Sequence, residues 1–250
     1  MDLISGIEEL KHKQSLPYYE SGDKILDELL SGGFQQDLIY LVYGDRKIIV
    51  DILLKTIVNT FKDKDFSKKV VYIDGNNRFN PYMISKLAAA RRLSPRSVLE
   101  SILISRAFTF EQMVEVLENR ISELEQVKML IVSGITTLWP NYTQATFEGL
   151  LKAIAGIKKS LLKNNPVLIL TAPLNKYSEF KPKGGKYLAH FGSVLIMINN
   201  KKRFIEYSLI QHPSLPERVV RKVKPLKLKR NLKKPLKNLT LDQFLKIKSE

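Results

Sequence analysis

The 250-residue sequence contains no cysteine, which excludes disulfide bonds, thiol catalysis and cysteine-based metal sites. Histidine is nearly as scarce, and its three copies lie far apart, so no histidine-rich metal site is expected. No apolar run approaches the roughly 18 residues that a membrane-spanning helix needs, and residues 1–16 do not resemble an apolar signal segment. We therefore expect a soluble, cytoplasmic protein with no membrane contact, metal ion or cofactor.

Acidic residues are also too few to balance the basic ones, and the net charge is +16. The excess is concentrated, because residues 201–250 hold 15 Lys and Arg but only 4 Asp and Glu. Such a region favours a polyanionic partner, most simply nucleic acid. The alternatives are a solubilising tail or the lysine-rich surface of a thermophilic protein. Because 44% of the residues are apolar, the chain has enough material for a sizeable core.

Apolar strand-like runs alternate with helical runs of 10–17 residues, which is typical of βαβ units and a mostly parallel sheet. The predicted strands are Leu38–Tyr43, Lys69–Asp74, Ile102–Ser105, Met129–Ser133, Val167–Thr171 and Gly192–Ile198. The predicted helices are Ile48–Phe61, Pro81–Leu93, Phe110–Leu124 and Thr146–Leu162, and residues 1–16 read as a short amphipathic helix. The fold class is therefore α/β, with helices on both faces of the sheet.

The carboxyl-terminal part of the sequence has a different pattern. Arg203–Gln211 and Glu217–Val223 predict a hairpin that adds antiparallel edge strands. From Pro225 the chain is a low-complexity basic segment, and Thr240 and Gln243 have the spacing of a capping box for a short final helix. This tail either docks on a partner or packs on its own domain, and the sequence does not favour one over the other.

One strand–loop–helix segment looks like a phosphate-binding loop that has lost its function. A working loop reads Gly-x-x-x-x-Gly-Lys-Ser/Thr, in which backbone N–H groups and the lysine bind phosphate and the hydroxyl binds Mg²⁺. Here the segment is Gly44-Asp45-Arg46-Lys47-Ile48-Ile49-Val50-Asp51, so only the first glycine is kept. Val50 replaces the lysine and Asp51 replaces the hydroxyl residue. Arg46 and Lys47 either contact an anion or form an exposed charged turn.

Six segments in the expected order resemble the ATPase core of RecA/RadA recombinases. They begin at Gly22, Val71, Ser105, Leu130, Lys183 and His212, and the last two read Lys-Gly-Gly-Lys-Tyr-Leu-Ala-His and His-Pro-Ser-Leu-Pro-Glu. The resemblance covers about residues 18–223. It is closest to an archaeal RadA paralogue of the kind that has the ATPase core without the preceding helical DNA-binding domain. It implies a RecA-like twisted sheet in a core domain at 18–224, preceded by an arm at 1–17 and followed by a basic tail at 225–250.

The departures from this family affect every catalytic position. In the alignment that the resemblance implies, Asn76 stands in place of the catalytic Glu and Ser133 in place of the Walker B Asp. Ala172-Pro173 replaces the phosphate-sensing Asn-Gln. Phosphoryl transfer depends on positioned cations and a positioned water. We therefore expect a pseudo-ATPase, and we give less weight to an active enzyme with an unorthodox nucleotide site.

The family's two DNA-binding loops correspond here to residues 138–144 and 174–186. In the second loop, lysines can neutralise phosphates and aromatic rings can stack on the bases of single-stranded DNA; these residues are Lys176, Tyr177, Phe180, Lys181, Lys183 and Lys186. The alternative is that Tyr177 and Phe180 anchor the loop on its own domain or on a neighbouring subunit. The tail would add contacts to phosphates through Lys227, Lys229, Arg230, Lys233, Lys234 and Lys237. Trp139 is expected in the core or an interface, and His190 in the core.

Two functions are consistent with these residues. The first is a non-catalytic RadA-like protein that associates with the chromosome, binds DNA and modulates recombination or repair. It would act through an active RadA-type recombinase or another RadA paralogue. The alternative is a protein-interaction scaffold or KaiC-like regulator that does not bind DNA, whose basic tail would contact an acidic protein.

Overall fold

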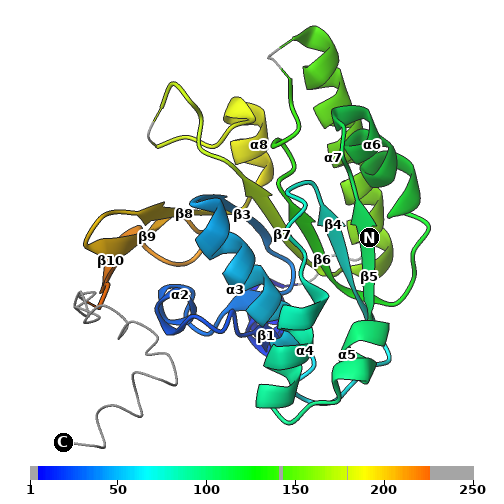
Figure 1. Cartoon of the computed structure of the whole chain (residues 1–250), viewed down its shortest axis with the longest axis vertical. Coiled ribbons are helices and arrows are strands. Elements are labelled where there is room, and N and C mark those ends of the chain that lie inside the picture. The colour runs from blue at the N-terminus through cyan, green and yellow to red at the C-terminus, as the bar shows by residue number, and fades with distance from the viewer. Residues whose placement is uncertain (1–4, 141–142, 179, 226–250) are drawn as a thin grey trace, which may run out of the picture.

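A computed structural model describes residues 5–140, 143–178 and 180–225 and shows one large sheet covered by helices on both faces (Figure 1). Its eight strands follow the order β10-β9-β8-β3-β7-β6-β4-β5. They are β3 (Ile39–Gly44), β4 (Lys69–Asp74), β5 (Ile102–Arg106), β6 (Val127–Ser133), β7 (Val167–Ala172), β8 (Val194–Asn200), β9 (Phe204–Gln211) and β10 (Arg218–Val223). A separate two-stranded sheet pairs β1 (Tyr18–Tyr19) with β2 (Phe34–Gln35).

Six strands, from β8 to β5, pair in parallel, whereas β9 pairs antiparallel with both β8 and β10. The central strands are buried along almost their whole length, as expected for parallel strands with helices on both faces. Helix α1 (Gly6–Ser15) precedes the first strand. The helices between strands are α2 (Lys24–Leu29), α3 (Arg46–Asn59), α4 (Pro81–Ala90), α5 (Pro95–Glu100), α6 (Phe110–Glu115), α7 (Gln144–Asn164) and α8 (Gly185–Phe191). A π-helical turn, η1 (Val116–Arg120), continues α6.

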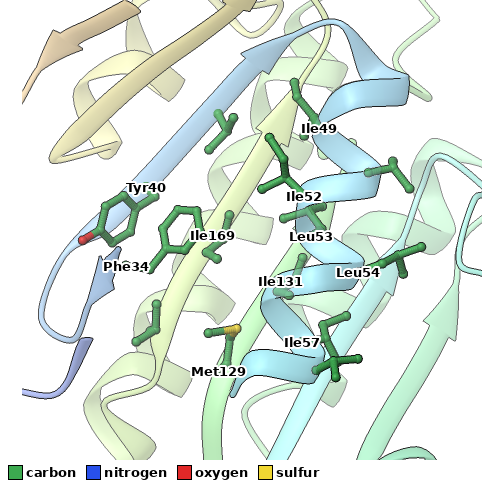
Figure 2. Close-up of a cluster of buried hydrophobic side chains, with 14 of the residues drawn as sticks. Phe34, Tyr40, Ile49, Ile52, Leu53, Leu54, Ile57, Met129, Ile131 and Ile169 are labelled. Carbon is green, nitrogen blue, oxygen red and sulfur yellow. The ribbon is translucent and has the colours of Figure 1, made fainter. Parts of the chain in front are cut away.

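Alternate residues of each strand belong to two separate cores, because successive side chains point to opposite faces of the sheet. One core lies between the sheet and α2, α3, α4 and α5, and in it Leu53 of α3 faces the strands that carry Ile131 and Ile169 (Figure 2). The other core lies between the sheet and α6, η1, α7 and α8. Leu41 belongs to this second core, whereas its neighbour in the chain, Tyr40, belongs to the first.

A buried carboxylate ties the terminal hairpin to the start of the core domain. Asp23 caps α2 by accepting hydrogen bonds from the backbone N–H groups of Ile25 and Leu26. Its second oxygen accepts hydrogen bonds from the Tyr207 hydroxyl at 3.0 Å and the Lys222 ammonium at 2.9 Å. Asp23 therefore joins α2 to the β9–β10 hairpin, which lies far from α2 in the sequence.

The structure confirms the predicted α/β class, the mostly parallel sheet and the antiparallel terminal strands. All six predicted strands and all four long helices are present, with ends that differ by a few residues; the helix expected at 110–124 is divided into α6 and η1. The short elements α2, α5, α8 and the β1–β2 ribbon were not predicted. Among the described residues, no helix combines the length and the apolar character that crossing a membrane requires.

Candidate nucleotide site and nucleic-acid interface

The segments singled out in the sequence meet at one edge of the sheet, where the parallel strands end. Ligands of open α/β sheets bind at this carboxyl edge. Gly44 ends β3 there with a φ of 125°, and a Cβ at this position would lie 2.1 Å from the carbonyl oxygen of Ile198. The close approach of β3 to β8 therefore requires glycine at this position, whether or not phosphate binds.

The segment from Gly44 to Asp51, expected to be a degenerate phosphate loop, contains almost no loop. Helix α3 begins at Arg46, immediately after the strand, so residues 46–51 form its first turns. This stretch has no second glycine that could hold an open loop, and Ile49 and Val50 are buried in the core. Burial of these apolar side chains favours the helix over a loop that wraps around phosphate.

The amino terminus of α3 is capped by a carboxylate of the protein itself. Asp45 Oδ1 accepts a hydrogen bond from the backbone N–H of Ile48 at 3.0 Å. Its Oδ2 accepts one from the side-chain amide of Asn200 at 2.9 Å, and Asn200 in turn accepts one from the Lys224 ammonium. A negative group at a helix amino terminus satisfies free N–H groups and interacts favourably with the helix dipole. This carboxylate therefore lies where a phosphate-binding helix would present its N–H groups to the ligand.

The two residues that the resemblance aligns with a phosphate-binding lysine and a Mg²⁺-binding hydroxyl have other contacts here. Val50 is only 7% exposed and belongs to the core beneath α3. Asp51 is partly exposed and forms an ion pair with Lys55, one helical turn further on, at 2.6 Å. Arg46 and Lys47 are exposed at the start of the helix.

Asn76 and Ser133 come together at the ends of β4 and β6, as the resemblance predicts for a catalytic pair, but their polar groups bind each other. The amide nitrogen of Asn76 donates a hydrogen bond to Ser133 Oγ at 3.0 Å. Its amide oxygen accepts one from Thr137 Oγ1 at 3.0 Å. Ser133 is completely buried. These three neutral side chains contain neither a general base nor a carboxylate that binds Mg²⁺.

The space left at this edge is small. A cavity of about 130 Å³ is lined by Arg46, Ile49, Asn76, Thr137, Thr171, Ala172 and Pro173. Ligand sites commonly measure about 300–1,000 Å³. In the described part of the chain, no group of three or more His, Asp or Glu side chains has the arrangement of a metal site.

The second predicted DNA loop, residues 174–186, has a fixed base. Leu174 pairs with Pro182 in a β-bridge, and the backbone N–H of Asn175 donates to the carbonyl of Lys181 at 2.8 Å. The buried hydroxyl of Tyr43 donates to the carbonyl of Phe180 at 3.0 Å, which ties the loop to β3. Because the base is held at several points, its tip is presented outward rather than collapsed on the sheet.

The two aromatic side chains of this loop are exposed, Tyr177 by 93% and Phe180 by 68%. They do not anchor the loop on its own domain, whereas anchoring on a neighbouring subunit stays an alternative to DNA binding. Lys176, Lys181 and Lys186 are also exposed.

Lys183 differs from the other lysines of the loop. Its ammonium donates a hydrogen bond to the carbonyl of Trp139 at 2.9 Å, and Thr136 donates to its carbonyl at 2.8 Å. Burial, together with the nearby charge of Lys176, lowers the pKa of Lys183. A contact between Lys183 and phosphate would require the side chain to leave this position.

A cleft beside the loop contains residues that sequence reasoning missed. It measures about 490 Å³ and is lined by Leu174, Asn175, Lys176, Tyr177, Ser178, Asn199 and Lys201. Lys201 belongs to the exposed basic run Lys201-Lys202-Arg203 between β8 and β9. This run was the one available signal, but only the fold shows that it lies beside residues 174–178. The cleft combines an aromatic ring, two ammonium groups and amide groups, and it is lined by no carboxylate.

Trp139 is 4% exposed and packs edge-on against Phe110, which confirms its expected place in the core. The prediction for His190 was wrong, because this residue is exposed at the end of α8. An exposed position fits the polar imidazole, whereas Leu188 fills the core from the same helix. The tail residues Lys227, Lys229, Arg230, Lys233, Lys234 and Lys237 lie outside the described residues, as does the helix predicted from Thr240.

A RecA-like sheet with its candidate sites at the carboxyl edge defines the class of this protein, and comparison with known sequences defines its family. The sequence profile of the Rad51 family matches residues 12–149. The chain belongs to the Rad51 family.

Relatives with assigned names support this membership. The chain is 27% identical to the DNA repair and recombination protein RadB of Methanococcus maripaludis over 201 residues, which cover 75% of this chain and 88% of RadB. It is 26% identical to a meiotic recombination protein DMC1 homologue of Glycine max over 86% of this chain and 68% of that protein. It is 30% identical to the DNA repair and recombination protein RadA of Cenarchaeum symbiosum over 55% of this chain. That alignment spans about a third of RadA, 36% of its length.

Proposed function

We propose that this chain is a non-catalytic member of the Rad51 family, a pseudo-ATPase that binds DNA and modulates recombination or repair through a partner recombinase. The role in recombination and repair rests on the named functions of RadA, RadB and the DMC1 homologue. The single observation that carries the loss of catalysis is the start of α3 at Arg46, capped by Asp45, where nucleotide phosphate would need an open loop.

The polar residues at the neighbouring strand ends support the same proposal. Asn76 donates a hydrogen bond to Ser133, and neither side chain can take a proton from water at neutral pH. The adjoining cavity of about 130 Å³ lies below the usual size of a ligand site. Arg46 lines this cavity, but its lining includes no carboxylate that could hold Mg²⁺ and no general base, so a triphosphate would be poorly stabilised there.

The second loop supports binding to single-stranded DNA. Exposed rings such as Tyr177 and Phe180 can stack on bases of any sequence, while Lys176, Lys181 and Lys201 can neutralise phosphates. Such an interface recognises the backbone and the base faces, so it favours single strands without a fixed sequence.

A protein partner is supported by β5 at the edge of the sheet. Its neighbour is β4 on one side, and it has no neighbouring strand on the other side within the described residues. Leu103 and Ile104 are 38% and 44% exposed there. An open edge with apolar side chains is a template for a strand from another protein. This feature fits a partner recombinase, and it would also fit the alternative function of a protein scaffold that does not bind DNA.

Catalysis is tested by measuring phosphate release and melting temperature with Mg²⁺ and ATP. The full chain and the Asn76→Ala variant are expected to release no phosphate above a protein-free blank, and ATP should leave the melting temperature unchanged. Turnover by the full chain that Asn76→Ala abolishes would overturn the pseudo-ATPase proposal.

Binding to DNA is tested with fluorescent single- and double-stranded oligonucleotides across a salt series. The full chain is expected to bind single strands more tightly, and its affinity should fall as salt rises because counterions are released. A truncation after Lys224 should keep single-strand binding but show a smaller salt slope, since the basic residues of the tail are lost. If neither protein binds near physiological salt, the scaffold function replaces the DNA-binding one.

A further inference from the structure

A groove between α6–η1 and α7 lies on the side of the carboxyl edge of the sheet, at the first turns of α6 and α7, and Pro140 and Thr143 of the first predicted DNA loop line it. It measures about 480 Å³, within the range of ligand sites. Phe110, Val114, Pro140 and Gly149 contribute an apolar floor. Gly149 is essential to this shape, because a Cβ there would lie 2.5 Å from the ring of Phe110.

The rim of the groove is acidic, although the chain as a whole carries a net charge of +16. Four carboxylates and one ammonium group line it: Glu111, Glu115, Glu118, Glu148 and Lys152. Arg120 pairs with Glu115 at 3.5 Å. Within the described chain, Glu111 and Glu118 form no ion pair. An apolar floor with unpaired carboxylates at its rim suits an apolar segment that also carries positive charge.

The chain itself contains a segment of this composition in its tail. Residues 225–237 read Pro-Leu-Lys-Leu-Lys-Arg-Asn-Leu-Lys-Lys-Pro-Leu-Lys, with four leucines, six basic residues and no acidic residue. Leucine and lysine alternate at residues 226–229, so an extended chain would place Leu226 and Leu228 on one side and Lys227 and Lys229 on the other. The leucines match the apolar floor, and the lysines match the acidic rim.

The positions of the groove and of the tail's origin favour binding between two copies. The tail follows β10 at one edge of the sheet, whereas α6 lies on the opposite side of the molecule (Figure 1). Eight strands at ~4.8 Å spacing span about 34 Å. Residues 226–237, fully extended at about 3.3 Å per residue, reach ~40 Å. Reaching the groove of its own chain would use almost the whole segment, so few leucines would remain to fill the groove.

We infer that the α6–α7 groove of one copy binds residues 225–237 of a second copy. The contact is apolar at its centre and electrostatic at its rim, and it needs neither nucleotide nor DNA. Because tail and groove lie at opposite sides of the chain, the contact is head-to-tail and can be repeated along a row of copies. DNA that binds the same basic residues would compete with it.

The first test compares full-length variants by sedimentation at several protein concentrations and without DNA. The wild-type chain is expected to self-associate, and Glu111→Lys with Glu118→Lys should weaken the association about tenfold or more. The matched control, Glu123→Lys with Glu217→Lys, changes the net charge equally at two exposed positions outside the groove and should behave as wild type. Equal weakening by both pairs, or a wild-type chain that stays monomeric, overturns the inference.

A charge exchange then tests the specific pairing. Adding Lys227→Glu and Lys229→Glu to the weakened groove variant is expected to restore self-association to within a few-fold of wild type, because opposite charges again face each other. Restoration identifies the tail as the occupant of the groove. Failure to restore, with an unchanged melting temperature, overturns that assignment.

Disulfide cross-linking distinguishes contact between copies from contact within one chain. Because the sequence contains no cysteine, each introduced cysteine can pair only with another introduced one. A tagged Glu148→Cys chain and an untagged Leu232→Cys chain are mixed under mild oxidation. A disulfide forms only where the two Cα atoms approach within about 7 Å. The mixture is expected to give several-fold more heterodimer than a mixture in which Glu123→Cys replaces Glu148→Cys. If a chain that carries both Glu148→Cys and Leu232→Cys forms only an intramolecular disulfide, the inference is overturned.

Discussion

The carboxylate of Asp45 accepts a hydrogen bond from the side-chain amide of Asn200 at 2.9 Å, across 155 positions of sequence. The same carboxylate caps α3. This contact joins the residue after Gly44, in the segment that resembles a phosphate loop, to the end of β8, and Lys224 extends it to the end of the terminal hairpin. A position that belongs to the phosphate loop in the resemblance here holds neighbouring elements of the fold together.

We predict that Asp45→Ala lowers the free energy of unfolding by about 1–2 kcal/mol, because α3 loses its cap and Asn200 loses an acceptor. Urea unfolding at neutral pH measures the change. Asp45→Asn should cost less, since the amide oxygen can still cap the helix. An exposed control, Glu217→Ala, should change the free energy by less than about 0.5 kcal/mol. Equal stability of Asp45→Ala and this control would contradict the structural role.

The second prediction concerns the pH dependence of stability through Asp23. Burial raises the pKa of this carboxyl, but the hydrogen bond and charge of Lys222 and the Tyr207 hydroxyl outweigh burial, so its pKa is lowered overall. A carboxyl whose pKa is lowered by folding stabilises the protein above its unfolded pKa of about 3.9, and this contribution disappears as pH falls through the folded value. Asp23→Asn should therefore cost about 1–3 kcal/mol at pH 7 and clearly less near pH 3.

Urea unfolding of wild type and Asp23→Asn at several pH values measures this difference. Asp63→Asn is the control, because Asp63 is exposed. A cost of Asp23→Asn that is the same at pH 7 and pH 3 would show that packing, rather than the charge of the carboxylate, accounts for it.

Local sequence patterns were enough for the large sheet. Strands such as Val167–Ala172 are continuous apolar runs, and their burial on both faces follows from that composition. Helix α3 starts at Arg46, two residues before the predicted start at Ile48, because the segment was interpreted by its alignment with a phosphate loop. Asp45, however, is a good N-cap residue three positions before Ile48, which would have favoured a helix.

The parts of the site that the sequence did not reveal depend on contacts between distant segments. Nothing local to Lys183 distinguishes it from Lys181, yet its ammonium is turned toward the Trp139 carbonyl while Lys181 stays exposed. Likewise, Lys201 joins the cleft beside Tyr177 only because β8 brings the turn after it to the same edge as the loop. Such contacts depend on strand order and register, which local composition does not determine.

For the aromatic residues of the second loop, Tyr177→Ala is expected to weaken single-strand binding by about 1–3 kcal/mol, because one stacked base is lost. The salt slope should stay unchanged, since no charge is removed. Fluorescence anisotropy with a labelled oligonucleotide measures both quantities. The matched control is Tyr82→Ala, an aromatic side chain on α4 that is 85% exposed. Equal losses for the two variants would exclude a specific role of the loop.

The final prediction uses two adjacent lysines. Lys201 lines the cleft with Lys176 and Tyr177, whereas Lys202 is exposed but does not line it. Lys201→Ala should lower the salt slope of single-strand binding by about 0.7, the value for one phosphate contact, and weaken binding at low salt. Lys202→Ala removes the same charge one residue away and should have a smaller effect on both. If the two variants are indistinguishable, the basic turn attracts DNA only through its overall charge, and the cleft is not part of the binding site.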